Sequence, residues 1–377
     1  MFNQLILQYS APSPMTGVVT YETDGETVQD TFFLEPAENG TFTLLIQGAL
    51  AGKTAGNLRI RSLTAPRGMA QDAQIHEIRT ETVTLPTEAW LEKDGIRLGI
   101  TLEMGGAVSS LHDADAPAGY TNLLNRCDPG RLIQQSYYGC HTSPYEMGEF
   151  MGNPWPYNPV QGGDKGGNQS RIIAFTRQEN EIYIKAQPYD WGHVGHITPS
   201  YMENRYTFLE NGLIRVDNRF TDFSGLPHPP RHQELPAFYV VSALDVFTWE
   251  TGGVRYSRDD MIFWPLAKDQ NFPVREDAWC AWHDRSGYGV GLAVPGAEQF
   301  YAGRHEYNGS ADPHNAATNY VAPLKTVGLQ SYVPLTYSYL LAVGQLADMA
   351  KSLQRHLPEI CTGNLMEYGK SSGNTDH

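Results

Sequence analysis

Polar and aromatic side chains are concentrated in four segments of the chain, and these segments hold the residues best suited to chemistry. The first segment, residues 122–139, contains amides, two arginines and two adjacent tyrosines. The second, residues 153–164, contains Trp155 and Tyr157 and ends in a glycine-rich loop with Asp164. Amide side chains donate and accept hydrogen bonds, as vicinal sugar hydroxyls do, and aromatic rings offer an apolar face for a sugar. These two segments therefore indicate a carbohydrate-binding site.

The other two segments supply candidates for proton transfer. Residues 189–196 contain His193, whose imidazole titrates near neutral pH. Residues 228–236 place Glu234 where a polar run enters an apolar strand expected over residues 237–244. Partial burial at such a junction raises the pKa of a carboxyl group and suits it to general acid catalysis.

We expect Asp164 and Glu234 to act as a carboxylate pair that cleaves a glycosidic bond, with His193 as a further catalytic residue. In such pairs one carboxyl group is the acid and the other the base or nucleophile, and a separation of about 5 Å gives retention, about 6.5–9.5 Å inversion. Alternatively, Asp164 orders its loop and Glu234 pairs with Arg231 or Arg205. The predicted substrate-binding residues are Arg131, Gln134, Gln135, Tyr138, Trp155, Asn158, Gln161, Trp191 and His232.

Other catalytic and cofactor-dependent classes fit the sequence less well. His193 and His196 lie three residues apart without an HExxH pattern, so we predict no metal site and no cofactor. The glycine spacing matches neither GxGxxG nor a phosphate-binding loop, and no GxSxG motif is present. His141 follows Cys140 directly, but adjacency in sequence does not create a nucleophile–base pair.

Composition limits the partners and the compartment. The chain of 377 residues carries a formal net charge of −15, which disfavours nucleic acids and anionic membranes as partners. No apolar run of about 18 residues is present, and the N-terminus lacks the features of a signal peptide. We therefore expect a cytoplasmic protein with reduced cysteines, a small sugar or oligosaccharide as its substrate, and possible homo-oligomers. Export would permit pairing of Cys127 with Cys140.

The pattern of short alternating segments predicts an all-β protein. Residues 1–86 are expected to form a small β-sandwich, residues 87–360 a large antiparallel domain, and residues 361–377 a polar tail. Within the large domain we expect hairpins across 202–220 and 278–294 and a strand over 332–343. Helical spacing of apolar residues predicts one helix over 344–357. Residues 120–200 show little periodicity, and Gly105 and Gly106 permit a tight reversal between strands.

The longer motifs also resemble a known family. The run IRLGITLEMGGAVSSLHD at 96–113 resembles the entry strands of the galactose-mutarotase-like β-supersandwich, shared by aldose 1-epimerases, several polysaccharide lyases and parts of glycoside hydrolases. The runs NLLNRCDPGRLIQQSYYG, NPVQGGD and RHQELPA are similar to those of a bacterial, carbohydrate-associated group with that fold. Together the resemblance covers about residues 90–345.

The resemblance implies a sugar site on the concave face of a large antiparallel sheet. Aldose epimerases of this fold use a glutamate base and a histidine acid, which would correspond to Glu234 and His193. Lyases of this fold present Arg, Asn, His and Tyr to a uronate, for which Arg131, Asn158, His193 and Tyr138 are available, although the charge of −15 disfavours a long polyanion. An epimerase or mutarotase, a lyase and a non-catalytic sugar-binding protein are thus the alternatives to glycoside hydrolysis.

Overall fold

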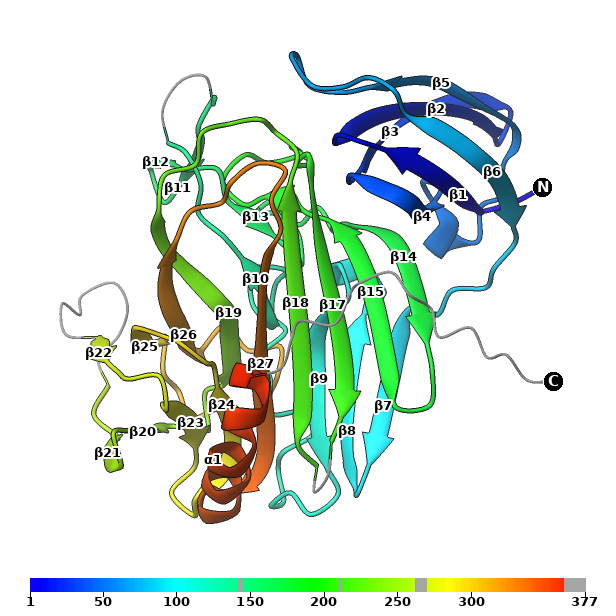
Figure 1. The fold of residues 1–377 in the computed structure, drawn as a ribbon. Helices are drawn as coiled ribbons and strands as arrows, with labels where there is room; N and C mark the ends of the chain where they lie inside the picture. The colour runs from blue at the N-terminus through cyan, green and yellow to red at the C-terminus, as the bar shows by residue number, and fades with distance from the viewer. Residues whose placement is uncertain (142–144, 210–211, 262–269, 363–377) are drawn as a thin grey trace. The chain divides into compact units, whose positions relative to one another are not determined.

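The computed structural model describes residues 1–141, 145–209, 212–261 and 270–362. Its contacts divide the chain into two compact units, Met1–Pro86 and Thr87–Thr362 (Figure 1). Both units are built from antiparallel strands, so the predicted all-β class is confirmed.

The N-terminal unit consists of two three-stranded sheets. The rings of Phe32 and Phe42, from different sheets, stack with centroids 5.4 Å apart in the core between them. Asp24 and Gly25 both have positive φ and close the hairpin that DG in the sequence predicts. The sheet orders are β4 (Ala37–Leu45), β1 (Gln4–Ala11), β6 (Gln74–Glu81) and β3 (Glu26–Leu34), β2 (Met15–Thr23), β5 (Gly56–Thr64).

The second unit stacks two large sheets, which have ten and nine strands among the described residues. The ten-stranded sheet runs β22 (Asn271–Pro273), β25 (Gln299–His305), β26 (Thr318–Val327), β19 (Arg231–Val241), β10 (Ile133–Ser136), β9 (Ala107–Asp113), β8 (Ile96–Thr101), β7 (Glu88–Lys93), with β13 (Pro159–Val160) paired to β10 and β16 (Tyr189–Asp190) to β13. The nine-stranded sheet runs β14 (Arg171–Arg177), β15 (Glu181–Gln187), β17 (Ser200–Phe208), β18 (Ile214–Asp222), β27 (Leu335–Gln345), β24 (Tyr288–Ala293), β23 (Trp279–His283), β20 (Val246–Thr251), β21 (Val254–Arg258).

Direct hydrogen bonds join the two sheets. Tyr206 of β17 donates its hydroxyl to the carbonyl of Gly106 at 2.8 Å. The side chain of Gln135 in β10 donates to the side-chain oxygen of Asn204 in β17 at 3.0 Å. Helix α1 (Leu346–Thr362) covers the nine-stranded sheet at β23, β24 and β27, with Met349 and Leu353 in the buried cluster (Figure 1).

Several element predictions can be compared with the structure. The hairpins β17–β18 and β23–β24 and the strand β27 are confirmed, although Asn211 in the first turn lies outside the described residues. The helix begins two residues later than expected and continues to Thr362. The prediction of little regular structure over residues 120–200 is wrong for β14 and β15, whose buried residues alternate along β15 as in a half-buried strand. The predicted polar tail lies almost entirely outside the described residues.

Gly105 sits at a position where a side chain would be costly. Its φ is +61°, and a Cβ there would lie 2.1 Å from the carbonyl oxygen of Gln161. We expect Gly105→Ala to lower the free energy of unfolding by at least about 2 kcal/mol, because backbone strain adds to a clash with backbone. Urea denaturation measures this loss. Gly253→Ala is the matched control, because Gly253 has φ +75° and no atom within 4 Å of such a Cβ; equal losses in the two variants would contradict the account.

Candidate functional site

Glu234 lies on β19 in the middle of the ten-stranded sheet, where it stands opposite Ser136 of β10 and Leu324 of β26. Its carboxylate oxygen Oε1 accepts two hydrogen bonds from tyrosine hydroxyls. Tyr138 donates at 3.1 Å and Tyr320 at 2.6 Å. Tyr138 precedes Glu234 by almost a hundred residues and Tyr320 follows it by a similar number, so long-range packing around β19 brings the three side chains together.

Burial raises the pKa of Glu234, and hydrogen bonds from Tyr320, Tyr138 and Ser136 oppose that shift without cancelling it. Neither arginine considered as its partner forms an ion pair with it. Arg205 pairs with Glu181 at 3.0 Å, and Arg231 donates to the carbonyl of Gly139 at 3.0 Å. Within the described part of the chain Glu234 therefore has hydroxyl donors but no cationic partner, so no nearby cation offsets the effect of burial on its pKa.

Four tyrosines surround this carboxylate. Burial, together with the charge of Glu234, raises the pKa values of Tyr138, Tyr239 and Tyr320 well above the usual range, and that of Tyr301 to about 12. The ring of Tyr320 lies 4.6 Å from that of Tyr239 and 6.0 Å from that of Tyr301, centroid to centroid. At neutral pH these phenols are protonated, so they are hydrogen-bond donors around one acidic group.

Tyr239, Tyr301 and Tyr320 are not among the site residues predicted from the sequence. Each is a partly exposed tyrosine flanked by buried residues within a strand, on β19, β25 and β26 respectively. That local pattern was available in the sequence, since a lone tyrosine among small and apolar residues has a polar tip that needs a partner. Their convergence on Glu234 depends on the register of three strands.

Asp164 lies in the loop after β13 and is fully buried. Its Oδ1 accepts from the backbone N–H groups of Gly166 and Asn168 at 2.9 and 3.0 Å. Its Oδ2 accepts from the Asn168 side chain at 2.8 Å and from the N–H of Gly195 at 2.7 Å. Four donors thus occupy this carboxylate, which ties its own loop to the loop that follows β16.

His193 lies in that second loop, where its ring stacks on His196 with centroids 4.8 Å apart. Asp190 orders the loop, because its Oδ1 accepts from the N–H groups of Gly192 and His193 at 3.2 and 3.3 Å. Burial raises the pKa of Asp190 and lowers that of His196. Nδ1 of His193 has no hydrogen-bond partner in the described structure.

The predicted amide ligands occupy the interior. Gln134 holds the loop before β10, donating to Pro129 at 2.8 Å and accepting from the N–H of Gly162 at 2.6 Å. Gln135 and Gln161 are fully buried and share the side-chain oxygen of Asn204 between the two sheets. Asn158, also buried, donates to the carbonyl of Tyr137 at 2.7 Å. These four amides are therefore engaged by protein groups in the interior of the unit.

The predicted aromatic ligands Tyr138, Trp155 and Trp191 form a row together with Phe150, which was not predicted, and the row starts beside Glu234. Tyr138 and Trp155 have ring centroids 6.2 Å apart, and Phe150 lies 5.1 Å from Trp155 and 5.7 Å from Trp191. Phe150 and Trp155 belong to the hairpin of β11 (Gly148–Phe150) and β12 (Asn153–Trp155). All four rings are partly exposed, so the row presents aromatic surface next to the carboxylate.

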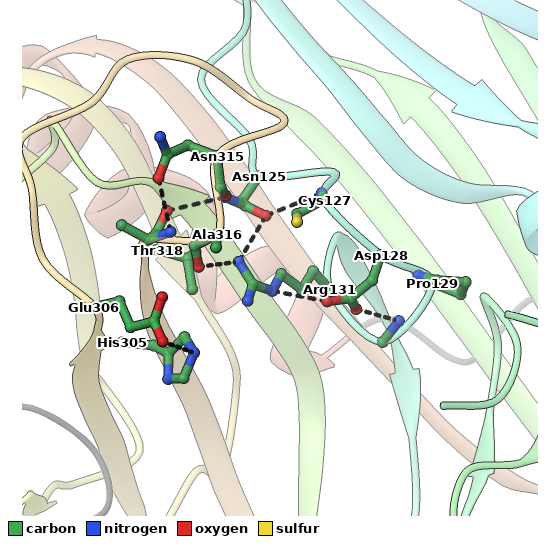
Figure 2. Close-up of polar contacts among 12 residues, drawn as sticks. Asn125, Cys127, Asp128, Pro129, Arg131, His305, Glu306, Asn315, Ala316 and Thr318 are labelled. Atoms are coloured by element: carbon green, nitrogen blue, oxygen red, sulfur yellow. Dashed lines mark hydrogen bonds and ion pairs between the residues drawn. The ribbon is translucent and has the colours of Figure 1, made fainter. Parts of the chain in front are cut away.

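The guanidinium of Arg131 contacts residues of the loop before β10 and of a second loop, as Figure 2 shows. Nε pairs with Asp128 at 3.1 Å, and Nη1 donates to the carbonyl of Ala316 at 2.6 Å and to the side chain of Asn125 at 3.2 Å. The charges of Asp128 and Arg131 both act on the pKa of Tyr239, which places this loop beside the tyrosines. Arg131 thus joins two loops at the rim of the site.

His232 lies two residues before Glu234 on the same strand and is exposed. Its Nδ1 is 3.3 Å from the side-chain nitrogen of Gln299. His232 lines a depression of 490 Å³ together with Tyr138, Pro230, Arg231 and Thr326. The structure therefore gathers Glu234, Tyr138, His232 and the aromatic row, and it places Asp164, Gln135 and Gln161 in structural networks.

Three further properties concern the described residues only. No group of three or more His, Cys, Asp or Glu side chains is arranged to hold a metal ion. None of their helices is long and apolar enough to cross a membrane. Three cysteines, Cys127, Cys140 and Cys280, are free in this structure.

No protein-family model matches the sequence, and no curated protein matches it. Solved structures do match, among them the galactose mutarotase related enzyme from Lactobacillus acidophilus, with a TM-score of 0.41 and 11% identity over 68% of this chain and 97% of that chain. The GalM/aldose epimerase homologue from C. elegans has a TM-score of 0.36 and 10% identity over 69% of this chain and 99% of its own. A GH36 alpha-galactosidase, AgaB from Geobacillus stearothermophilus, matches with a TM-score of 0.39 and 13% identity, over 70% of this chain and 41% of that chain.

Proposed function

We propose that this protein is a carbohydrate-active enzyme that moves a proton at the anomeric centre of an aldose, as mutarotases and aldose epimerases do, with Glu234 as the base. One observation carries the proposal: a single carboxylate with a raised pKa is held by the hydroxyls of Tyr138 and Tyr320 on one oxygen, beside a row of partly exposed aromatic rings.

The reaction requires one base and one acid. The carboxylate of Glu234 takes the proton of the anomeric hydroxyl while a donor protonates the ring oxygen, and the bond between the anomeric carbon and the ring oxygen breaks. Rotation in the open-chain aldehyde and the reverse steps then give the other anomer. The motif resemblance assigns the acid to His193. Because a base works best with a pKa near the working pH, the burial that raises the pKa of Glu234 favours this role.

Paired-carboxylate hydrolysis, which the sequence analysis predicted, has less support from the geometry. It needs a second carboxyl group free to act on the substrate. All four hydrogen bonds to Asp164 come from its own loop and from Gly195. The charged and titratable neighbours that influence Glu234 are tyrosines, so proton transfer by one carboxylate fits the site better.

Proton NMR of the protein with a panel of aldoses and short oligosaccharides tests the proposal. Faster equilibration of the α and β anomers, without cleavage, is the expected result. New reducing-end signals would instead show hydrolysis, and vinylic signals would show elimination by a lyase; either result would overturn proton transfer at the anomeric centre. No change with any sugar would contradict catalysis and favour a sugar-binding protein.

The pH dependence of kcat/KM follows from the ionisation of Glu234. A base must be deprotonated, so the rate should fall as the pH drops through its pKa, at a midpoint above the value of about 4.3 that is typical of glutamate. Tyr320→Phe removes a donor that stabilises the ionised form, so the midpoint should move higher still. Rates measured from about pH 4 to 8 check both statements. A midpoint that Tyr320→Phe leaves unchanged or lowers would contradict them.

A further inference from the structure

Gln233 directly precedes Glu234 on β19, and its side chain is fully buried. Its amide oxygen accepts from the N–H of Tyr138 at 2.7 Å, and its amide nitrogen donates to the carbonyl of Tyr138 at 2.8 Å. The same nitrogen donates to the carbonyl of Val327, the last residue of β26, at 3.3 Å. Both ends of the Gln233 amide are therefore used on backbone, and both hold Tyr138.

These hydrogen bonds lie just beyond the end of a strand pairing. The pairing of β10 with β19 ends at Ser136, which stands opposite Glu234. Two residues later the side chain of Gln233, instead of the backbone of β19, bonds to the N–H and carbonyl of Tyr138. The N–H groups of the residues before and after Tyr138 donate to carbonyls within residues 157–159. Gln233 thus links Tyr138 to β19 where the regular ladder has stopped.

The position of Tyr138 affects the carboxylate of Glu234. The hydroxyl of Tyr138 donates to Oε1 of Glu234 at 3.1 Å, beside the hydroxyl of Tyr320 at 2.6 Å. Both hydrogen bonds lower the pKa of Glu234 and so oppose the effect of burial. Hydrogen bonds weaken steeply with distance and angle, so a displaced Tyr138 main chain would weaken this contact.

The titratable groups that face this carboxylate from the neighbouring strands are tyrosines. Besides Tyr138, they are Tyr239 on β19, Tyr301 on β25 and Tyr320 on β26, and burial raises the pKa of each, so all are uncharged at neutral pH. The loop before β10 contributes an ion pair, Asp128 with Arg131 at 3.1 Å, whose charges act on the pKa of Tyr239. A change in a hydroxyl donor therefore alters the pKa of the carboxyl group without altering the charge around it.

We infer that Gln233 is a positioning residue: its amide holds the main chain of Tyr138 where the tyrosine hydroxyl reaches Glu234. The inference rests on the proposed function only in that Glu234 is the base. Gln233 is fully buried, so it acts through Tyr138 and does not contact a sugar. Loss of its amide should weaken the same hydrogen bond that Tyr138→Phe removes.

Titration of the Glu234 carboxyl group by NMR, with isotope-labelled glutamate, tests this inference without requiring turnover. The signal is assigned by its absence from Glu234→Gln. Tyr138→Phe should raise the pKa of Glu234 by about one unit, as expected for the loss of one hydrogen bond to a charged group. Gln233→Met keeps the length of the side chain without the amide and should cause a similar rise. The double variant should show no further rise, whereas Gln233→Met and Tyr320→Phe together should shift the pKa by more than either alone.

The matched control is Asn122→Leu, which removes another buried amide that bonds to backbone. Asn122 accepts from the N–H of Leu111 at 3.0 Å and donates to the carbonyl of Ser109 at 2.9 Å. This variant should lose stability and leave the pKa of Glu234 unchanged. If Gln233→Met does not fold, Gln233→Asn serves instead, because an amide shorter by one methylene cannot make both contacts from the same position. It should raise the pKa by a smaller amount.

The outcomes separate this inference from the proposed function. Additive shifts from Tyr138→Phe and Gln233→Met, a folded Gln233 variant with the wild-type pKa of Glu234, or an equal shift in Asn122→Leu would overturn the positioning role. Non-additive shifts in a protein that does not exchange anomers would uphold the positioning role and reject the proposed function. Where exchange occurs, the pH midpoint of kcat/KM should rise in Gln233→Met by as much as the pKa. A midpoint that stays at the wild-type value would contradict the link to catalysis.

Discussion

Glu234→Gln should lower the rate of sugar turnover by about 10³-fold, because a positioned general base contributes about 10²–10⁴-fold to such a reaction. Glutamine keeps the shape of the side chain, and its amide oxygen still accepts from Tyr138 and Tyr320. The change therefore removes the base with little effect on the surrounding contacts. Anomer exchange followed by NMR or polarimetry measures the loss, and a variant that retains wild-type kcat would contradict the assignment.

The same variant should be at least as stable as wild type at neutral pH. A folded-state pKa above the unfolded value means that ionisation of Glu234 costs the native state free energy. This cost is absent below the unfolded pKa and develops as the pH rises through the folded pKa. The free energy of unfolding of Glu234→Gln, relative to wild type, should therefore increase from acid to neutral pH. The opposite slope would show that Glu234 is stabilised as the anion.

Asp164→Asn should lower the free energy of unfolding by about 2–4 kcal/mol, because an amide cannot accept all four hydrogen bonds and at least two donors would lose their partner. Urea denaturation measures this change. The matched control is Asp312→Asn, since Asp312 is exposed and accepts one backbone hydrogen bond, from His314 at 2.9 Å. The control should lose less than about 0.5 kcal/mol.

The activity of Asp164→Asn distinguishes its two possible roles. If Asp164 orders the loops around Asp190 and Trp191, the folded variant should keep most of its kcat. A variant with wild-type stability and no turnover would instead restore the paired-carboxylate mechanism. The comparison with Glu234→Gln is direct, because both substitutions exchange one carboxylate for the matching amide.

More of the fold than of the candidate site can be predicted from the sequence. Alternation within short segments predicts the hairpins β17–β18 and β23–β24 correctly, because this signal acts over a few residues. The junction of a polar run with an apolar strand also singles out Glu234. Gln135 and Gln161 have the chemistry of sugar ligands, but the register of the sheets directs them inward to Asn204. Composition carries no information about which face of a sheet a polar residue occupies.

The tyrosine partners of Glu234 also depend on strand pairing that the sequence does not predict. Tyr239 and Tyr320 are ordinary tyrosines in their own strands, and only the pairing of β19 with β26 makes them neighbours. The glycine-rich loop of Asp164 presents a different case. In the structure this buried carboxylate accepts hydrogen bonds from Gly166, Asn168 and Gly195 and orders two loops. An aspartate in a glycine-rich loop is compatible with this structural role and with a catalytic role, so the sequence does not distinguish them.

The most direct test of the central claim is chemical rescue of Glu234→Ala. This substitution removes the carboxylate and leaves space beside Tyr138 and Tyr320, which a small carboxylic acid can enter. We predict that formate restores part of the lost anomer exchange, with a rate that rises with formate concentration and saturates. Asp164→Ala should show no such rescue. A folded Glu234→Ala protein that formate does not reactivate, or one that needs no reactivation, would contradict the role of Glu234 as the catalytic base.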